Sequence, residues 1–230
     1  MRCNLCDADP FPPKDGGTRL ICDVCHSYER TRLLWLYIDR MMLGPATRVL
    51  HIAPERGLHA KLSARLSAEN YVTADLFPEK YPFADNIRRM DLCDLDREQS
   101  EQYDLIVHCH VLEHTPCSIG YTLHHLHRML RTTGKHVCVV PFMQGRWDES
   151  FADLSREEKT ERFGQFDHVR RFGADDVGAH LGAHLRLPAD FDATRDFPET
   201  TLREAAIPQG AWRGFGINTV LVLSKDDYRL

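Results

Sequence analysis

Short apolar runs alternate with longer amphipathic segments along most of the chain. Seven runs have the length and residue types of strands, and they lie at residues 48–53, 71–75, 87–92, 103–108, 135–141, 185–187 and 218–224. Apolar residues at helical spacing occupy segments at 57–66, 118–130 and 174–181. Alternation of this kind predicts an α/β domain built on a mostly parallel sheet.

The segment Tyr103–Pro141 is the clearest part of this pattern. A buried strand ends in a polar loop, an amphipathic helix follows, and a second buried strand begins at Lys135. Thr133 and Gly134 precede that strand, and we expect them to form the turn that ends the helix. The segment therefore predicts a β–α–β unit, and ligands of open α/β sheets bind where such strands end.

Four cysteines form two closely spaced pairs near the N-terminus. Cys3-x2-Cys6 and Cys22-x2-Cys25 would each present two thiolates from a tight turn, and four thiolates complete a closed tetrahedral zinc shell. The intervening PFPPKDGG consists of turn residues, as the hairpin of a zinc ribbon requires. The spacing predicts a zinc ribbon at residues 1–26. Four unrelated thiols or two disulfides are the alternatives.

A connecting helix is predicted within residues 27–45. Its leucine, tyrosine and methionine side chains form a broad apolar face that we expect to dock the ribbon on the main domain. Ser27 is the predicted N-cap, without the acidic residue that a capping box needs three positions later.

Composition and charge exclude several classes of protein. The formal net charge of −5 gives no electrostatic reason to expect nucleic acid as a partner. No apolar run approaches the roughly 20 residues that span a bilayer, and the chain does not begin with a hydrophobic leader, so we expect a cytoplasmic protein. In that reducing compartment, the four scattered cysteines are expected to pack as small apolar side chains; they are Cys93, Cys109, Cys117 and Cys138.

Several short motifs resemble class I S-adenosylmethionine (SAM) methyltransferases. Leu112-Glu113-His114, Arg128-Met129-Leu130 and Val140-Pro141 resemble the later half of that family. The first loop, His51-Ile52-Ala53-Pro54-Glu55, resembles a branch in which this sequence replaces the usual glycine-rich loop, with Glu29–Arg32 following a four-cysteine segment. The resemblance implies a Rossmann-like sheet of seven strands with helices on both faces. The methyltransferase domain would span residues 46–230, with a substrate-side insertion at about 142–173.

The resemblance also implies where SAM would bind. The first loop would face its methionine part, Asp75 and Leu76 its ribose, and Asp91 and Leu92 its adenine. His110, after the fourth strand, is the best candidate for direct contact. The expected cofactor residues are therefore His51, Ala53, Pro54, Glu55, Asp75, Leu76, Asp91, Leu92 and His110. Either aspartate could instead be a solvated residue at a strand end, and NAD is an alternative ligand that the missing GxGxxG motif disfavours.

The acceptor is expected on the side of the long segment after the fifth strand. His168 could remove a proton from an attacking oxygen or nitrogen, and Arg170 could hold a carboxylate; with His110 these are the candidate catalytic residues. An Asp–Arg network that fixes the loop is the alternative. Glu113 and His114 could cap the following helix or hold their loop in place.

The sequence thus predicts a SAM-dependent methyltransferase with a structural zinc ion and a small polar acceptor. The protein would orient the two reactants for in-line displacement. An RNA methyltransferase that grips its substrate with the ribbon is one alternative. A SAM enzyme with a different reaction and a non-catalytic binding module are the others.

Overall fold

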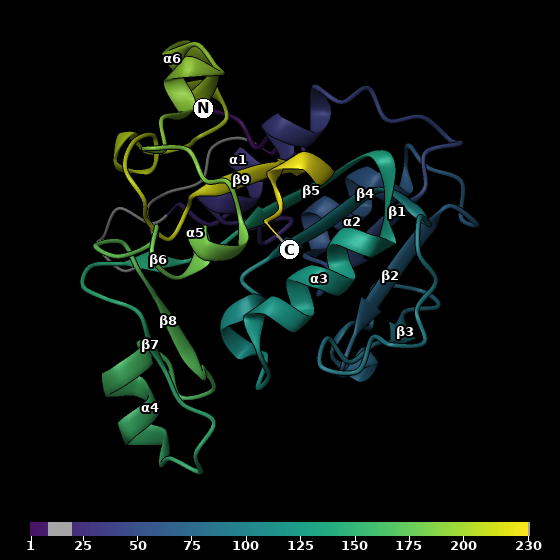
Figure 1. Cartoon of the computed structure of the whole chain (residues 1–230). Coiled ribbons are helices and arrows are strands. Elements are labelled where there is room, and N and C mark those ends of the chain that lie inside the picture. Colours follow the sequence, from purple (N-terminus) through teal and green to yellow (C-terminus); the bar gives the residue numbers. More distant parts are fainter. Residues whose placement is uncertain (9–19, 230) are drawn as a thin grey trace.

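The computed structural model describes residues 1–8 and 20–229. Its main sheet has the strand order β3-β2-β1-β4-β5-β9 (Figure 1). All neighbours are parallel except β5 and β9. The strands are β1 (Val49–Ile52), β2 (Tyr71–Asp75), β3 (Arg88–Arg89), β4 (Tyr103–Cys109), β5 (Leu130–Val139) and β9 (Val220–Ser224). The predicted α/β class, with its mostly parallel sheet, is confirmed.

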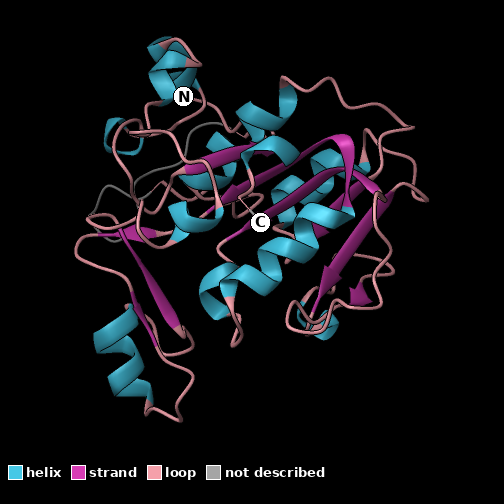
Figure 2. Cartoon of the chain, in the orientation of Figure 1, coloured by secondary structure: helices cyan, strands magenta, loops and turns pink. Residues whose placement is uncertain are grey.

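Helices cover both faces of this sheet because the strand residues point alternately to opposite sides. On one face, α1 (Glu29–Asp39) and α2 (Arg56–Ser63) pack against Val49 and Val107. On the other, α3 (Ile119–Met129) packs against Leu50 and Ile106, and Figure 2 shows it lying across the front of the strands. A sheet buried on both faces explains why its strands are continuous apolar runs in the sequence.

The prediction of seven strands in this sheet is wrong, because the main sheet has six. The run expected at 185–187 does not form a strand; Leu185 makes only an isolated antiparallel bridge to Tyr228. The helix expected at 174–181 is also displaced, since α5 covers only Leu181–His184. Asp175, Asp176 and Gly178 lie there instead in a stretch of bends and turns.

The turn predicted at Thr133 and Gly134 is also wrong. β5 begins directly after α3 at Leu130, which pairs with Tyr103 before the register shifts. A Cβ atom on Gly134 would lie 2.8 Å from the carbonyl oxygen of Tyr103. Gly134 is therefore required for close strand approach at an irregularity of the ladder and not for a helix stop.

The segment after β5 forms a second, smaller sheet with the strand order β6-β8-β7. Its strands are β6 (Phe142–Met143), β7 (Asp148–Glu149) and β8 (Arg170–Gly173), and α4 (Arg156–Phe163) lies between β7 and β8 in the chain. Figure 1 shows this unit projecting from the main sheet on the side of α5. α6 (Glu199–Glu204) follows in the C-terminal part of the chain. Among the described residues, no helix has both the length and the apolar character needed to cross a membrane.

The N-cap of the connecting helix α1 lies one residue after the predicted cap. Tyr28 is its N-cap and makes no side-chain capping bond. Ser27 is buried instead beside the cysteines, with its hydroxyl 3.2 Å from Cys25 Sγ and 3.4 Å from Cys3 Sγ. Arg32 of α1 is fully buried and donates to carbonyl groups of the cysteine segment and of the C-terminal segment, including Ser27 and Ala206.

Candidate functional site

A cavity of about 370 Å³ lies at the carboxyl ends of β1, β2 and β4. This is the edge at which open α/β sheets bind their ligands, and the volume lies within the range of small-molecule sites. Six of the nine expected cofactor residues line it: Ala53, Asp75, Leu76, Asp91, Leu92 and His110. Its wall also includes residues that the sequence analysis did not single out as cofactor ligands: Lys80, Tyr81, His114, Thr115, Pro116 and Asp167.

The two aspartates are held by their own loops. Asp75 Oδ1 accepts a hydrogen bond from the backbone of Phe77 at 2.7 Å, and its Oδ2 accepts one from Tyr81 Oη at 2.9 Å. Asp91 Oδ1 accepts from the backbone of Cys93 at 2.8 Å. Both carboxylates therefore have fixed positions on the cavity wall, each with further lone pairs available to a ligand.

The ends of β1 and β4 carry backbone conformations that non-glycine residues rarely adopt. Ala53 has φ +50° and His110 has φ +55°, and both residues line the cavity. Left-handed conformations of this kind cost free energy and concentrate at ligand sites. Ala53 thus makes the tight turn that a glycine usually makes, which explains how a loop without glycines can follow β1.

The other three expected cofactor residues lie outside the cavity wall. His51 is buried in β1 and hydrogen-bonds Tyr71 Oη at 2.7 Å. Pro54 is buried, and Glu55 accepts a hydrogen bond from Thr31 Oγ1 of α1 at 2.8 Å. Burial raises the pKa of Glu55 and lowers that of His51 to about 3. These side chains link the first loop to α1 and β2.

Glu113 is the centre of a polar cluster at the cavity. Its carboxylate is 1 % exposed, and neither oxygen accepts a hydrogen bond from a described residue. His110 Nδ1 lies 3.5 Å and His114 Nε2 lies 4.0 Å from its Oε1. Burial raises the pKa of Glu113 to about 8 and lowers that of His110 to about 3. His168 completes the cluster, and its Nδ1 lies 3.1 Å from the carbonyl oxygen of Phe163.

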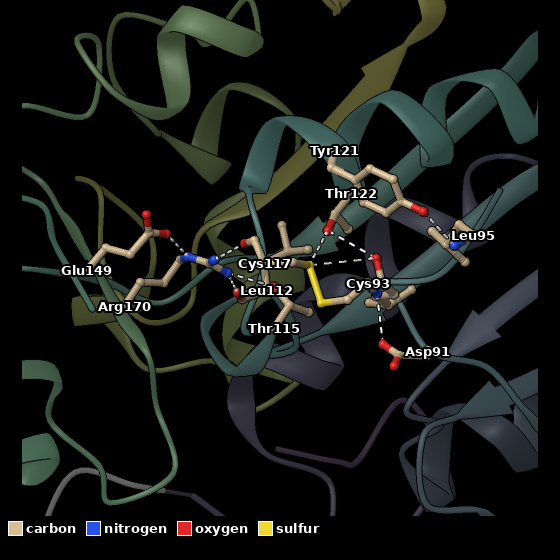
Figure 3. Close-up of a disulfide and its surroundings, with 11 residues drawn as sticks. Asp91, Cys93, Leu95, Leu112, Thr115, Cys117, Tyr121, Thr122, Glu149 and Arg170 are labelled. Atoms are coloured by element: carbon tan, nitrogen blue, oxygen red, sulfur yellow. Dashed lines mark hydrogen bonds and ion pairs between the residues drawn. A yellow bond between two sulfur atoms is a disulfide. The ribbon is translucent and has the colours of Figure 1, made fainter. Parts of the chain in front are cut away.

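The guanidinium of Arg170, a candidate for holding a carboxylate of the acceptor, makes its hydrogen bonds within the protein. Its guanidinium is fully buried, and Figure 3 shows it reaching Glu149 on one side and the loop before α3 on the other. It donates to Glu149 Oε1 at 2.7 Å, to Thr115 Oγ1 and the Cys117 carbonyl at 2.6 Å each, and to the Leu112 carbonyl. The alternative considered above, an acid–arginine network that fixes the loop, describes this arrangement, although the acid is a glutamate.

Cys93 and Cys117 form a disulfide, so the prediction that both pack as isolated thiols is wrong. Figure 3 shows the bond joining the loop after β3 to the loop before α3. Each cysteine directly follows cavity-lining residues, Leu92 in one case and Pro116 in the other. The bond therefore connects two walls of the cavity that lie 24 residues apart in sequence. Cys109 and Cys138 are free and buried, as expected.

The four N-terminal cysteines come together. Their sulfur atoms lie within 4.8 Å of one another, with 3.6 Å between those of Cys3 and Cys25 and 3.5 Å between those of Cys6 and Cys22. A tetrahedron with zinc–sulfur bonds of about 2.3 Å requires roughly 3.8 Å between sulfurs, so the group fits zinc. The predicted hairpin between the pairs falls mostly on residues 9–19, outside the described part of the chain.

Gly57 connects this cysteine cluster to the first loop. A Cβ atom on Gly57 would lie 3.0 Å from Cys25 Sγ and 3.4 Å from Leu5. Gly57, in the first turn of α2, is therefore needed where that helix begins against the cysteines. It does not line the cavity.

A second cavity, of about 410 Å³, is lined by Phe142, Met143, Gln144 and most residues from 210 to 219. His110 connects the two cavities, because its Nε2 donates to the carbonyl oxygen of Ile217 at 2.8 Å. Asn218 lies in this wall, and its Oδ1 is buried without a hydrogen-bond partner among the described residues.

Comparison with known proteins identifies the fold. The sequence matches no family model and no curated protein. A solved complex of the Haloferax volcanii Trm112 methyltransferase activator with a putative methyltransferase is similar at a TM-score of 0.50 and 14 % identity, over 84 % of this chain and 88 % of that one. YcgJ of Bacillus subtilis is similar at a TM-score of 0.48 and 14 % identity, over 78 % and 80 % of the two chains. The 1,6-didemethyltoxoflavin-N1-methyltransferase of Burkholderia thailandensis is similar at a TM-score of 0.48 and 16 % identity, over 70 % of this chain and 69 % of that one. The first of these likenesses shows that the chain has a methyltransferase-like α/β fold.

Proposed function

We propose that this chain is a SAM-dependent methyltransferase that acts on an oxygen, nitrogen or sulfur atom of a small polar molecule. The observation that supports this most is the cavity, which lies at the carboxyl edge of the sheet in a methyltransferase-like fold. Two fixed carboxylates from adjacent strand ends, Asp75 and Asp91, line it, as the resemblance to class I methyltransferases leads one to expect.

The cavity residues would bind SAM in three parts. The main chain at Ala53 would face its methionine part, Asp75 would accept hydrogen bonds from its ribose hydroxyls, and Asp91 with Leu92 would flank its adenine. His51, Pro54 and Glu55 would support the first loop from behind. When bound, SAM would supply a methyl group on a sulfonium ion that is its own leaving group.

The protein would contribute orientation, exclusion of water and a proton acceptor where one is needed. Burial lowers the pKa of His110 to about 3 and also lowers that of His168, so both imidazoles are neutral near pH 7 and can accept a proton. Arg170 would act as a positioning residue, because its donors hold the loop that carries Glu113 and Thr115.

The second cavity would receive the acceptor. It adjoins His110, and the buried Asn218 Oδ1 offers a hydrogen-bond acceptor to a polar group. The net charge of −5 favours a small molecule over RNA. Product mass after incubation with isotopically labelled SAM would identify a methylated acceptor, and strong weakening of binding by salt would favour RNA instead.

The four cysteines would hold a structural zinc ion. Four thiolates leave no coordination position for a substrate, so this ion would stabilise residues 1–26 and their docking on the main domain, with residues 27–45 as the connection.

Calorimetric titration of the zinc-replete protein with SAM, with NAD as a control ligand, tests the proposal. We expect saturable binding of SAM and none of NAD. Asp75→Ala should weaken SAM binding on the order of 100-fold, since it removes charged hydrogen bonds to the ribose. Asp85→Ala, at an exposed aspartate outside the cavity wall, is the matched control and should change nothing. Equal SAM affinity in all three proteins would overturn the assigned site.

A further inference from the structure

The Glu113 carboxylate is buried without the partners that such a group needs. Both oxygens lack a hydrogen bond from any described residue, although the side chain is only 1 % exposed. An ionised carboxylate in this state costs several kcal/mol unless a cation or a set of donors compensates it. A buried carboxylate of this kind beside a cavity is suited to bind a cation or another ligand.

The imidazoles around Glu113 do not supply the missing protons. His110 Nε2 and His168 Nδ1 face backbone carbonyls, which only accept, so these nitrogens carry the hydrogen. In a neutral ring the other nitrogen then has a lone pair. For His110 that nitrogen is Nδ1, 3.5 Å from Glu113 Oε1, so two lone pairs face each other when the carboxylate is ionised.

His114 repeats this arrangement. Its Nδ1 lies 3.5 Å from Asp167 Oδ2, which can accept a hydrogen bond from the ring N–H, and its Nε2 lies 4.0 Å from Glu113 Oε1. Histidines that ligate metals usually donate the other ring N–H to a carbonyl or carboxylate in this way, which fixes the tautomer. Donor atoms of Glu113, His114 and His168 all lie within 4.8 Å of one another.

We propose that Glu113, His114 and His168 bind a divalent transition-metal cation, with His110 Nδ1 adjacent as a further ligand. One carboxylate and two or three neutral imidazoles suit zinc, manganese, iron or cobalt better than calcium or magnesium. A cation at the centre of the cluster would satisfy the carboxylate and the converging lone pairs together. This assignment replaces the role of proton acceptor considered above for His168.

The site is held in place from two directions. The backbone N–H of Val169 donates to the carbonyl oxygen of Glu113 at 2.9 Å, which joins the segment that carries His168 to the one that carries Glu113. Arg170 fixes the same loop through Leu112 and Thr115. The ligands therefore have defined positions before any cation binds, as a functional metal site requires.

The site opens toward the cavity, because His110 and His114 both line it. Three or four protein ligands leave at least one coordination position for a ligand from that side. If the proposed function is right, the acceptor would be a molecule whose oxygen or nitrogen atom coordinates the cation beside the methyl group. The cation would then lower the pKa of that atom and orient it.

Manganese binding to protein that holds one equivalent of zinc, for the four cysteines alone, tests the site without SAM. Electron paramagnetic resonance of free Mn²⁺ would measure binding, and thiolates compete little for this ion. We expect one saturable Mn²⁺ site, weakened about 100-fold or more in both Glu113→Gln and His168→Gln. Glu161→Gln, at an exposed glutamate of α4, is the matched control and should bind as the unaltered protein does.

Each outcome bears on the proposal. Absence of saturable Mn²⁺ binding, or equal binding in Glu113→Gln, His168→Gln and Glu161→Gln, would overturn it. Thermal unfolding with and without Mn²⁺ guards against a folding defect, because the ion should raise the melting temperature of the unaltered protein and of Glu161→Gln alone. Mn²⁺ binding without SAM binding would support the cation site and overturn the proposed function. SAM binding without Mn²⁺ binding would support the proposed function and overturn the cation site.

Discussion

The cysteine cluster and the Glu113 cluster are both buried groups of metal-ligating side chains, but their surroundings differ. Cys3, Cys22 and Cys25 belong to a core that includes α1 and α2, and Gly57 closes the approach from the first loop. Glu113, in contrast, lies behind two histidines that line a cavity.

We propose that this difference separates a structural site from a functional one. A closed shell of four thiolates gives all its binding free energy to folding. A buried carboxylate without hydrogen bonds lowers stability while no ligand is bound, and proteins retain such groups where they serve a function. Removing ligands from the two clusters should therefore change stability in opposite directions.

The largest effect is expected at the cysteines. Cys22→Ser, or treatment with a strong chelator, should destabilise the protein by on the order of 10 kcal/mol of lost metal binding, enough to unfold at least the N-terminal region. Circular dichroism and thermal unfolding would measure this loss of stability. Cys138→Ala, at a fully buried cysteine outside the cluster, is the control and should cost only about 1–2 kcal/mol. Equal effects of the two substitutions would show that the cluster carries no metal.

At Glu113 we expect a substitution to raise the free energy of unfolding instead of lowering it. Glu113→Met removes an uncompensated buried carboxyl with little change in volume, so it should stabilise the protein by about 1–3 kcal/mol without added cation. Saturating Mn²⁺ should reverse the order, since only the unaltered protein gains from binding. Denaturant unfolding of the two proteins with and without Mn²⁺ measures both differences in stability. Glu161→Met should stay within about 0.5 kcal/mol of the unaltered protein, and a loss of stability in Glu113→Met without cation would mean that the carboxyl is already compensated.

A third buried group consists of His108, His136 and Tyr228, and it can be compared with the other two because it contains no carboxylate. His136 Nε2 lies 2.9 Å from His108 Nε2, and its Nδ1 lies 2.7 Å from Tyr228 Oη. Burial lowers the pKa of His136 to about 3, so below its ordinary value of 6.5 the unfolded chain takes up a proton that the folded chain does not. Stability should therefore fall as the pH drops from 7 to 5, by roughly 2 kcal/mol from this residue.

Unfolding free energies at pH 7 and pH 5 would test this. His136→Gln should flatten the dependence even if it lowers stability at both pH values. His124→Gln makes the same substitution at an exposed histidine of α3 and should leave the slope as it is. An unchanged slope in His136→Gln would assign the acid sensitivity to other groups.

The smallest effect concerns the contact between the cysteine cluster and the first loop. Gly57→Ala would place a methyl group 3.0 Å from Cys25 Sγ, and we expect a loss of about 1 kcal/mol together with faster release of zinc to a chelator. Gly44→Ala meets nothing within 4 Å and serves as the control. Zinc release at the same rate in both variants would show that α2 does not constrain the cluster.

The sequence alone determined the features that depend on local pattern. Continuous apolar runs predicted β1, β2, β4, β9 and the second half of β5, because strands that are buried on both faces leave that signal whatever surrounds them. The pairs at Cys3 and Cys22 predicted a four-cysteine cluster, since each pair closes within one turn. The residues after β1, β2 and β4, including Asp75 and His110, were recognisable because strand ends of an α/β sheet meet at one edge.

Only the tertiary structure decided which distant groups meet and which of them have partners. The Cys93–Cys117 disulfide and the buried contacts of Arg170 join residues that are 21 to 58 positions apart. The Glu113 cluster likewise brings in His168 from a distant segment. The role of Gly134 likewise depends on how closely β4 approaches it. Periodicity shows that a residue is buried, but hydrogen bonding and cation binding depend on atoms brought in from other elements by packing, which no local pattern records.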